Sequence, residues 1–314
     1  MKATESRSLA RHDALVSSDS AYQRRLRLLQ SLWRCEQDLP AGEHRGEPLG
    51  SSLAMPFAQE TLANYLTPTI QELVREEVEG PKGEGKLFAT PRIYNNLLSS
   101  QPLCFNLFGE LAVDLDLATA VCAQLWPGVV GAVTSIEFEW SPGRGDPKFL
   151  ANDSAFDVAI FHTTPNGEKG FIGIEVKYHE NMRAGAADHK GRYDEVADNS
   201  GVFVAPDSGA LRRPPLQQIW LAHMLGLSML EGGTWASGRF VVLYPSINGR
   251  CSAAVSKYES QLNSGSSFQG LHMEAAVDAI AQHTEAEWVA AFRGRYLDYA
   301  RAERVLDEVE PAGP

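Results

Sequence analysis

Cysteine is scarce in this chain of 314 residues, and long apolar runs are absent from it. The four cysteines are scattered and none forms a Cys-x-x-Cys pair, so we exclude a disulfide framework and a cysteine-based zinc site. No apolar run approaches the ~18 residues of a membrane span, and the first residues lack the apolar stretch of a signal peptide. These absences predict a cytoplasmic protein that has no membrane partner.

Positive charge is also in short supply. The chain has 28 Lys and Arg residues against 40 Asp and Glu residues, which gives a formal net charge of −12. This balance excludes a protein that coats nucleic acid through its overall charge, so any nucleic-acid contact must use local basic patches. Hydrophobic residues at 44% and charged residues at 22% are ordinary for globular proteins and exclude a disordered chain.

Two common catalytic patterns are missing. No Gly-x-Ser-x-Gly elbow marks a serine hydrolase. Residues 80–87, GPKGEGKL, approach the pattern of a phosphate-binding loop, but Leu87 occupies the position where Ser or Thr would hold magnesium. We therefore expect a surface loop in this segment.

Helical patterns dominate the first part of the chain. We predict a long loop over residues 40–56, which are rich in Pro, Gly and Ser, and a helix over residues 57–79. We divide the chain into a helical N-terminal extension, residues 1–89, and a core, residues 90–314, that ends in a helix. Arg295 in this last helix is expected to be a surface charge.

Short runs of alternating polarity then change the character of the sequence. Residues 134–140 have the period of a half-buried strand, with Ile136, Phe138 and Trp140 on one face. The apolar run at residues 239–245 predicts a buried strand. Together with the helical segments between them, these runs predict an α/β fold in which helices flank a mixed central sheet.

Two further runs form a predicted hairpin. Residues 156–162 and 170–177 alternate in polarity and are joined by a segment that contains the Asn-Gly pair of a tight turn. A turn centred on Asn166 pairs Asp157 with Glu175 directly across the hairpin. The two carboxylates are therefore expected to be neighbours.

The same alternation places Lys177 on the face that carries Glu175 and Asp157. Like charges opposite one another on a sheet are destabilising, so the two acids require a compensating cation. Their hard oxygen atoms suit Mg²⁺ (or Mn²⁺), which keeps several waters and accepts phosphate oxygens from a substrate. Lys177 is placed to orient an attacking water or to offset charge that develops on a phosphoryl group. Glu139, on the acid-facing side of the first strand, is a further candidate metal ligand.

This arrangement, Asp157 on one strand and Glu-Val-Lys at residues 175–177 on the next, resembles the core motif of the PD-(D/E)XK nuclease superfamily, which includes many restriction endonucleases. The segments FNLFGEL, IEFEWSPGRGD, SAFDVAIF and GFIGIEVKYHE are similar to those of uncharacterised bacterial proteins of the restriction-endonuclease-like type. The resemblance spans residues 90–305 and implies a restriction-endonuclease-like core.

The resemblance also implies roles for single residues. Asp157 and Glu175 correspond to metal ligands, the Val176 carbonyl to a third ligand and Lys177 to the catalytic lysine. Phe156 stands where the motif has its leading proline, a position that varies widely in the superfamily.

Two other positions follow from the resemblance. Glu110 matches the place where some members carry an additional metal-binding acid. Gln218 matches a glutamine that some members have near the active site, on the helix after the catalytic strand, with Gln217 as the alternative register.

The sequence therefore predicts a metal-dependent nuclease that hydrolyses phosphodiester bonds in DNA rather than RNA. A role in restriction or other defence rests on analogy with the family alone. The alternative is a catalytically silent module that uses the same fold to bind nucleic acid or a protein. A homodimer that cuts both strands is left open.

Overall fold

The computed structural model describes residues 3–180, 182, 188–265 and 267–307. The chain forms two compact units. The first, which we call the terminal unit, consists of Met1–Arg75, Phe88–Leu107 and Ala286–Pro314. The second, the sheet unit, consists of Glu76–Leu87 and Phe108–Glu285. Segments from both ends of the sequence thus belong to one unit. The predicted division into an N-terminal extension, residues 1–89, and a core, residues 90–314, concerns which parts fold independently and stays a prediction.

The sheet unit contains one mixed five-stranded sheet, which confirms the predicted fold class. The strand order is β3-β4-β5-β6-β7, with antiparallel pairing from β3 to β5 and parallel pairing from β5 to β7. The strands are β3 (Ala132–Trp140), β4 (Phe156–Thr163), β5 (Lys169–Val176), β6 (Ser237–Tyr244) and β7 (Phe268–His272). Only the antiparallel β4–β5 connection is a tight hairpin, because parallel neighbours need longer crossover segments.

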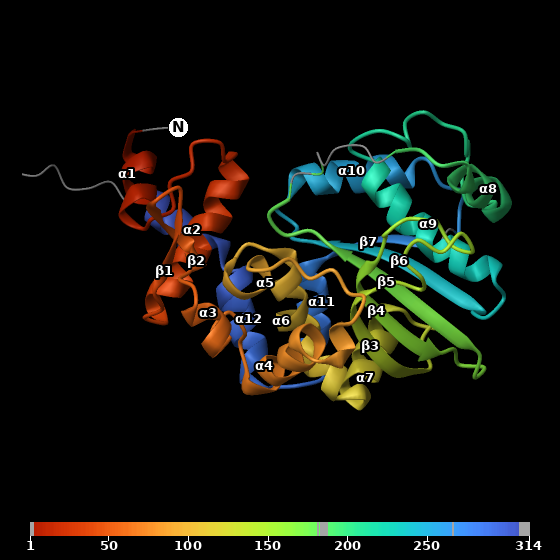
Figure 1. The fold of residues 1–314 in the computed structure, drawn as a ribbon, viewed down its shortest axis with the longest axis horizontal. Coiled ribbons are helices and arrows are strands. Elements are labelled where there is room, and N and C mark those ends of the chain that lie inside the picture. Colours follow the sequence, from red (N-terminus) through yellow and green to blue (C-terminus); the bar gives the residue numbers. More distant parts are fainter. Residues whose placement is uncertain (1–2, 181, 183–187, 266, 308–314) are drawn as a thin grey trace, which may run out of the picture. The chain divides into compact units, whose positions relative to one another are not determined.

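Helices cover both faces of this sheet (Figure 1). On one face α7 (Leu115–Leu125) packs against β3, and α11 (Met273–Ala281) packs against α7 and β7. On the other face α9 (Gln217–Glu231) packs against β6, with α8 (Gly191–Ser200) and α10 (Gly249–Glu259) next to it. The chain also contains α6 (Ser100–Val113) and two short turns, η1 (Arg75–Glu79) and η2 (Pro81–Gly83). The second turn lies in the segment that resembles a phosphate loop.

An aromatic core joins the sheet to α9. The rings of Phe171 and Phe240 lie 6.3 Å and 6.2 Å from the ring of Phe156, and Trp220 from α9 is fully buried in the same cluster. Gly173 makes room for this packing, because a Cβ atom there would lie 2.5 Å from the Phe156 ring. Close packing therefore immobilises Phe156, the residue directly before Asp157.

The terminal unit combines helices with a two-stranded hairpin. Its elements are α1 (Ala3–Arg11), α2 (Ala21–Glu36), β1 (Ala41–His44), β2 (Glu47–Leu53), α3 (Phe57–Thr61), α4 (Pro68–Val74), α5 (Arg92–Asn95), α12 (Glu287–Tyr296) and α13 (Tyr299–Asp307). The last two helices pack against α2, which brings the two ends of the sequence into one unit.

Two expectations for this unit are wrong. Residues 40–56 form the β1–β2 hairpin instead of a long loop, because Arg45 and Gly46 both adopt positive φ, at 56° and 81°, as a two-residue type I′ turn requires. The helix predicted over residues 57–79 is broken, because Leu62 adopts a left-handed conformation that ends α3.

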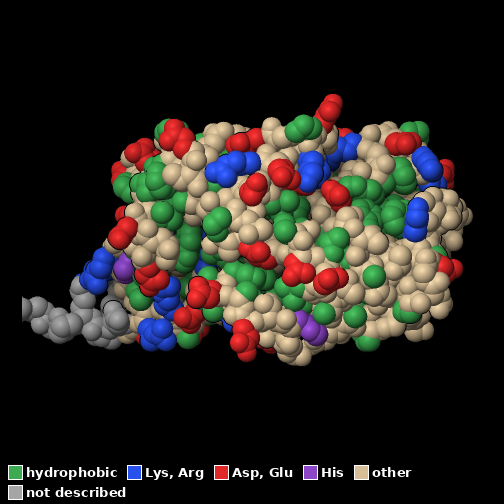
Figure 2. All heavy atoms as spheres, turned by 90° about the horizontal axis from the view of Figure 1, so that it is seen from below, with side chains coloured by type: hydrophobic (Ala, Val, Ile, Leu, Met, Phe, Trp, Pro, Cys, Tyr) green, Lys and Arg blue, Asp and Glu red, His purple; other side chains and the backbone are tan. Residues whose placement is uncertain are grey.

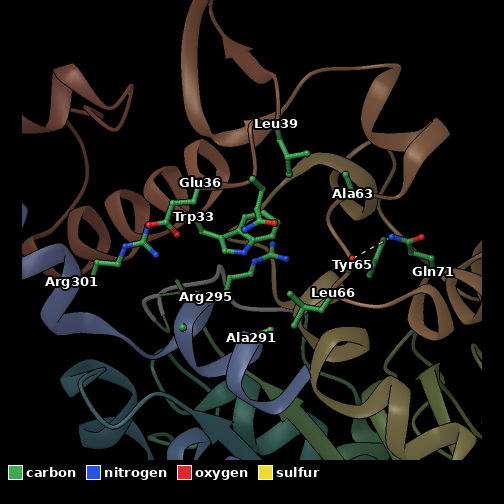
Figure 3. Close-up of a pocket in the computed structure, with 12 residues that line it drawn as sticks. Trp33, Glu36, Leu39, Ala63, Tyr65, Leu66, Gln71, Ala291, Arg295 and Arg301 are labelled. Carbon is green, nitrogen blue, oxygen red and sulfur yellow. Dashed lines mark hydrogen bonds and ion pairs between the residues drawn. The ribbon is translucent and has the colours of Figure 1, made fainter. Parts of the chain in front are cut away.

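The expectation that Arg295 lies on the surface is also wrong, since it is completely buried. Figure 3 shows its guanidinium beside Trp33, on the wall of a pocket of about 440 Å³ within the terminal unit. The guanidinium carbon lies 3.8 Å from the centre of the Trp33 ring, and the group donates hydrogen bonds to Gln30 (3.1 Å) and Asn64 (2.5 Å and 2.7 Å). Aromatic and amide partners replace the water that this cation loses.

Charge is spread over the face of the molecule that Figure 2 shows. Acidic side chains lie among basic ones there, in keeping with the excess of Asp and Glu. In the described part of the chain, no helix has both the length and the apolar character that crossing a membrane requires.

The buried His223 on α9 makes stability depend on pH. Burial lowers its pKa to about 3, and its ring nitrogens face the hydroxyls of Tyr258 and Ser267, each at 2.9 Å. Because the unfolded chain binds a proton near pH 6.5, the stabilising contribution of neutral His223 is complete above that pH and is lost as the pH falls toward about 3.

We expect the free energy of unfolding, measured by urea titration, to fall more steeply for the wild type than for His223→Gln between pH 7 and pH 5. The difference between the two proteins should shrink by about 2 kcal/mol over this range. His44→Gln, at an exposed position of β1, is the matched control. Parallel pH profiles for wild type and His223→Gln would contradict the assignment.

Candidate active site

The β4–β5 hairpin positions the two predicted acids. Its register pairs Val158 with Ile174 and Thr163 with Lys169, which confirms the predicted register, and Asp157 and Glu175 are the next residues along the two strands. Gly167 in the turn adopts a φ of 84°, a conformation that favours glycine. The short Asn-Gly turn therefore determines which acid faces which.

Strand pairing stops at this point, and side chains take over its hydrogen bonds. The Val176 amide donates to Oδ2 of Asp157 at 2.7 Å. On the other side of β5 the Lys177 amide donates to the carbonyl of Leu243 at 2.9 Å, so β5 remains attached to β6. Asp157 thus occupies the position where β4 and β5 separate, and its carboxylate satisfies a main-chain donor that has lost its strand partner.

Three predicted residues meet at one oxygen atom. Nζ of Lys177 lies 2.5 Å from Oε1 of Glu175, and the Gln218 side-chain amide donates to the same oxygen at 3.2 Å. Glu175 is 9% exposed and Lys177 is 5% exposed. Gln218, from the first turn of α9, is therefore the glutamine that reaches the acid, as the resemblance implies.

Burial and neighbouring charge act in opposite directions on Lys177. Burial by itself lowers the pKa of an ammonium group, but the carboxylates of Glu175, Glu180 and Asp157 more than offset it and raise the pKa of Lys177 above its usual range. The lysine is therefore charged at neutral pH. Glu180, four residues beyond the end of β5, adds to this effect, and its carboxylate accepts a hydrogen bond from the Tyr178 amide at 2.8 Å.

Asp157 shows the opposite balance. Burial and the negative charge of Glu175 raise its pKa well above the usual range, and Glu139 adds to the increase. The positive charge of Lys177 and the hydrogen bond from Val176 act against this but do not cancel it. A nearby cation in addition to Lys177 would favour the ionised form of Asp157.

The donor atoms fit a hard divalent cation. Asp157 and Glu175 supply carboxylate oxygens, and Val176 lies between Glu175 and Lys177 with a main-chain carbonyl as a candidate third ligand. Two or three protein oxygens suit Mg²⁺, which usually keeps several waters and takes the remaining ligands from a substrate phosphate. Among the described residues, no three side chains of His, Cys, Asp or Glu are arranged to hold a metal ion together. Glu110, half-buried near the end of α6, and Glu139 as further ligands stay predictions.

Glu139 lies next to this pair under strain. It stands between Phe138 and Trp140 on β3, whose partners on β4 flank Asp157, and it adopts a φ of 48°. A left-handed residue other than glycine costs ~1–2 kcal/mol. Arg144 holds it in place, because Nη2 lies 2.8 Å from Oε1 of Glu139. No sequence pattern links Arg144 to Glu139, so this ion pair could not be predicted from the sequence.

The same residue reverses the alternation of β3. Trp140 packs against Phe156 and Phe161 in the aromatic core next to α9, whereas Ile136 and Phe138 are buried outside that cluster. The expectation that Trp140 shares a face with Ile136 and Phe138 is therefore wrong. The positive φ of Glu139 is the physical reason, because it turns the strand over between residues 138 and 140.

Comparison with known proteins gives one family. A family model described as the PD-(D/E)XK nuclease superfamily matches residues 17–298 of the chain. No curated protein and no solved structure matches the chain. The matched range includes the whole β4–β5 hairpin and α9.

The charge balance of Asp157 predicts how stability changes in the metal-free protein. A carboxylate whose pKa is raised on folding contributes full stability below its unfolded pKa of about 3.9, and this stability is lost as the pH rises. Asp157→Asn keeps an acceptor for the Val176 amide but removes the negative charge. We therefore expect its melting temperature in EDTA to exceed that of the wild type at pH 7, with a gap that narrows toward pH 4.

The matched control is Asp153→Asn, which makes the same chemical change at an exposed position four residues away. Differential scanning calorimetry measures both variants. A melting temperature of Asp157→Asn below that of the wild type at pH 7 would show that Asp157 is stabilised as a carboxylate, contrary to this account.

Proposed function

The chain belongs to the PD-(D/E)XK nuclease superfamily, and from this premise we propose that it is a metal-dependent nuclease that hydrolyses phosphodiester bonds in DNA. The observation that carries the proposal is the cluster of Asp157, Glu175 and Lys177, in which a buried lysine stays charged next to two carboxylates. Most members of the superfamily are nucleases, and this chain has the Asp, Glu and Lys of its motif at Asp157, Glu175 and Lys177.

Asp157 and Glu175 are the residues that would hold a divalent cation, with the Val176 carbonyl as a third ligand. When bound, Mg²⁺ (or Mn²⁺) polarises a phosphoryl oxygen and lowers the pKa of a bound water. Gln218 and Lys177 both bind Oε1 of Glu175, so the orientation of this carboxylate is set before substrate arrives. Lys177 supplies a fixed positive charge that stabilises the charge developing on the phosphoryl oxygens.

The finer parts of the proposal rest on the resemblance. DNA as the substrate, a cytoplasmic location and a role in restriction or other defence are properties expected from similar bacterial proteins. The acidic balance of the chain, −12, agrees with binding through a local basic region rather than through overall charge. A silent binding module has less support, because a chain without catalysis has no need to keep Lys177 and Glu175 buried together.

The proposal is tested with purified protein and three substrates: plasmid, linear DNA and RNA. We expect cleavage of DNA with Mg²⁺ or Mn²⁺ and none in EDTA. Cleavage that persists in EDTA would overturn the metal requirement, and cleavage of RNA alone would overturn DNA as the substrate. DNA binding without cleavage under any metal, unchanged by Glu175→Ala, would establish the silent module instead.

Single substitutions separate the roles within the site. Lys177→Ala removes a positive charge from beside the acids, so Mn²⁺ binding measured by calorimetry should be kept or tightened, while the cleavage rate falls by about 10² or more. Asp157→Asn should weaken Mn²⁺ binding and cleavage together. Lys169→Ala, at the exposed far end of the same strand, is the control and should change neither. Loss of Mn²⁺ binding in Lys177→Ala, with binding intact in Asp157→Asn, would contradict these assignments.

A further inference from the structure

A groove of about 560 Å³ lies between α10 and the segment that leads into α9 in the sheet unit. One wall is formed by Pro214 and Pro215, and the other by α10 with Ala253 and Ala254. Two cations from the same helix, Arg250 and Lys257, also line it. The groove is thus an apolar surface with cations along one side.

The separation of the two cations along α10 matches the spacing of phosphates in a nucleic-acid strand. Arg250 and Lys257 are both exposed and lie seven residues apart, which is two turns and about 10 Å along a helix. This distance equals about three nucleotide steps of a stacked strand, at 3.4 Å per step. No carboxylate is among the described residues that line the groove, although acids outnumber bases in the whole chain. Local charge here is therefore opposite in sign to the net charge.

The elements that form the walls of the groove also contact residues of the candidate active site. Asn248 caps the N-terminus of α10, and its side-chain amide donates to the carbonyl of Glu180 at 3.3 Å. The charges of Lys177 and Glu175 act on the thiol of Cys251 in the first turn of α10. On the other wall, Pro215 lies three residues before Gln218, the amide that binds Glu175. Both walls are therefore extensions of elements that hold the site together.

We propose that this groove, which we call the α10 groove, binds the sugar–phosphate backbone of the DNA strand on one side of the bond that is cut. Arg250 and Lys257 contact phosphates, and the proline and alanine surface contacts the sugars. The proposal rests on the proposed nuclease function, because a phosphodiester substrate places a polyanion beside the acids. It also identifies the local basic region that an acidic protein needs for binding nucleic acid.

The first experiment measures DNA binding by the double variant Arg250→Ala/Lys257→Ala. Fluorescence anisotropy with a labelled 20-base-pair duplex is run in a Lys177→Ala background, so that the probe stays intact. We expect affinity at low salt to fall about 10-fold or more. The slope of log K against log salt concentration should become less negative by about 2, since each phosphate contact contributes about 0.9.

The control is Lys148→Ala/Lys169→Ala, which removes the same charge from two exposed positions of the sheet unit that do not line the groove. It should leave the salt slope unchanged. Equal slopes for the groove variant and the parent protein would overturn the proposal. Poly-glutamate binding is measured in the same way. If the groove variant loses poly-glutamate binding while its DNA affinity is unchanged, the groove binds an acidic polypeptide, which would also overturn the proposal. Because Arg250 and Lys257 are exposed, circular dichroism and melting temperature should match those of the parent.

A second experiment separates the groove from the chemistry. The small diester bis(p-nitrophenyl) phosphate has a single phosphate and no neighbouring phosphates for the groove to bind. Arg250→Ala/Lys257→Ala in the otherwise wild-type chain should therefore hydrolyse it with Mn²⁺ at the wild-type rate, while KM for DNA rises about 10-fold. If the wild type cleaves neither substrate but the salt slope changes as expected, the nuclease function fails and the groove stands. If DNA is cleaved and KM is unchanged in the variant, the groove fails and the nuclease function stands.

Discussion

The β4–β5 hairpin brings two carboxylates close together where its strands separate, and the rest of the site offsets their repulsion. Asp157 and Glu175 lie where β4 and β5 separate, so neither can move away without breaking the pairing that begins at Val158 and Ile174. Phe156, immobilised over Gly173, removes the remaining freedom on the β4 side. The acids are held together by backbone and packing rather than by mutual attraction.

Groups from several parts of the chain offset the negative charge of these carboxylates. Lys177 from β5 and Gln218 from α9 both bind Glu175, and a main-chain amide binds Asp157. The positive charge of Arg144 partly offsets the negative charge of Glu139, which lies on β3. Asp157 nevertheless keeps a raised pKa, so the described protein groups do not fully compensate its negative charge. Incomplete compensation of this kind is typical of a site prepared for a cation, whereas a purely structural ion pair would be neutralised within itself.

The approach to the site follows from the same framework. The first turn of α9 contributes Gln218, which binds Glu175 on β5, and the N-cap of α10 contributes Asn248, which binds the carbonyl of Glu180 just beyond β5. They then diverge to leave a groove with Arg250 and Lys257 along it. In the proposed binding mode, the elements that hold Glu175 and Glu180 therefore also carry the cations that contact the substrate backbone.

Sequence alone determined those features of this protein that depend on interactions between residues close in the chain. Alternating polarity and an Asn-Gly turn were enough to predict the hairpin and its register, because the strand period and the turn type are both set by residues that are close in the sequence. The motif at residues 175–177 indicated the superfamily, and the match over residues 17–298 confirmed it. Only the resemblance pointed to Gln218, since no local pattern links α9 to Glu175.

Tertiary structure decided the rest. The left-handed conformation of Glu139 transfers Trp140 to the opposite face, and Arg144, in the loop that directly follows β3, holds Glu139 in place. Arg295 is buried because Trp33, Gln30 and Asn64, all more than 200 residues away, surround it. The N-terminus of α10 lies beside Glu180, 68 residues earlier in the chain, where Asn248 donates to the Glu180 carbonyl. Periodicity reports which face of an element is apolar, but partners distant in sequence determine which charges become buried and which meet at a site.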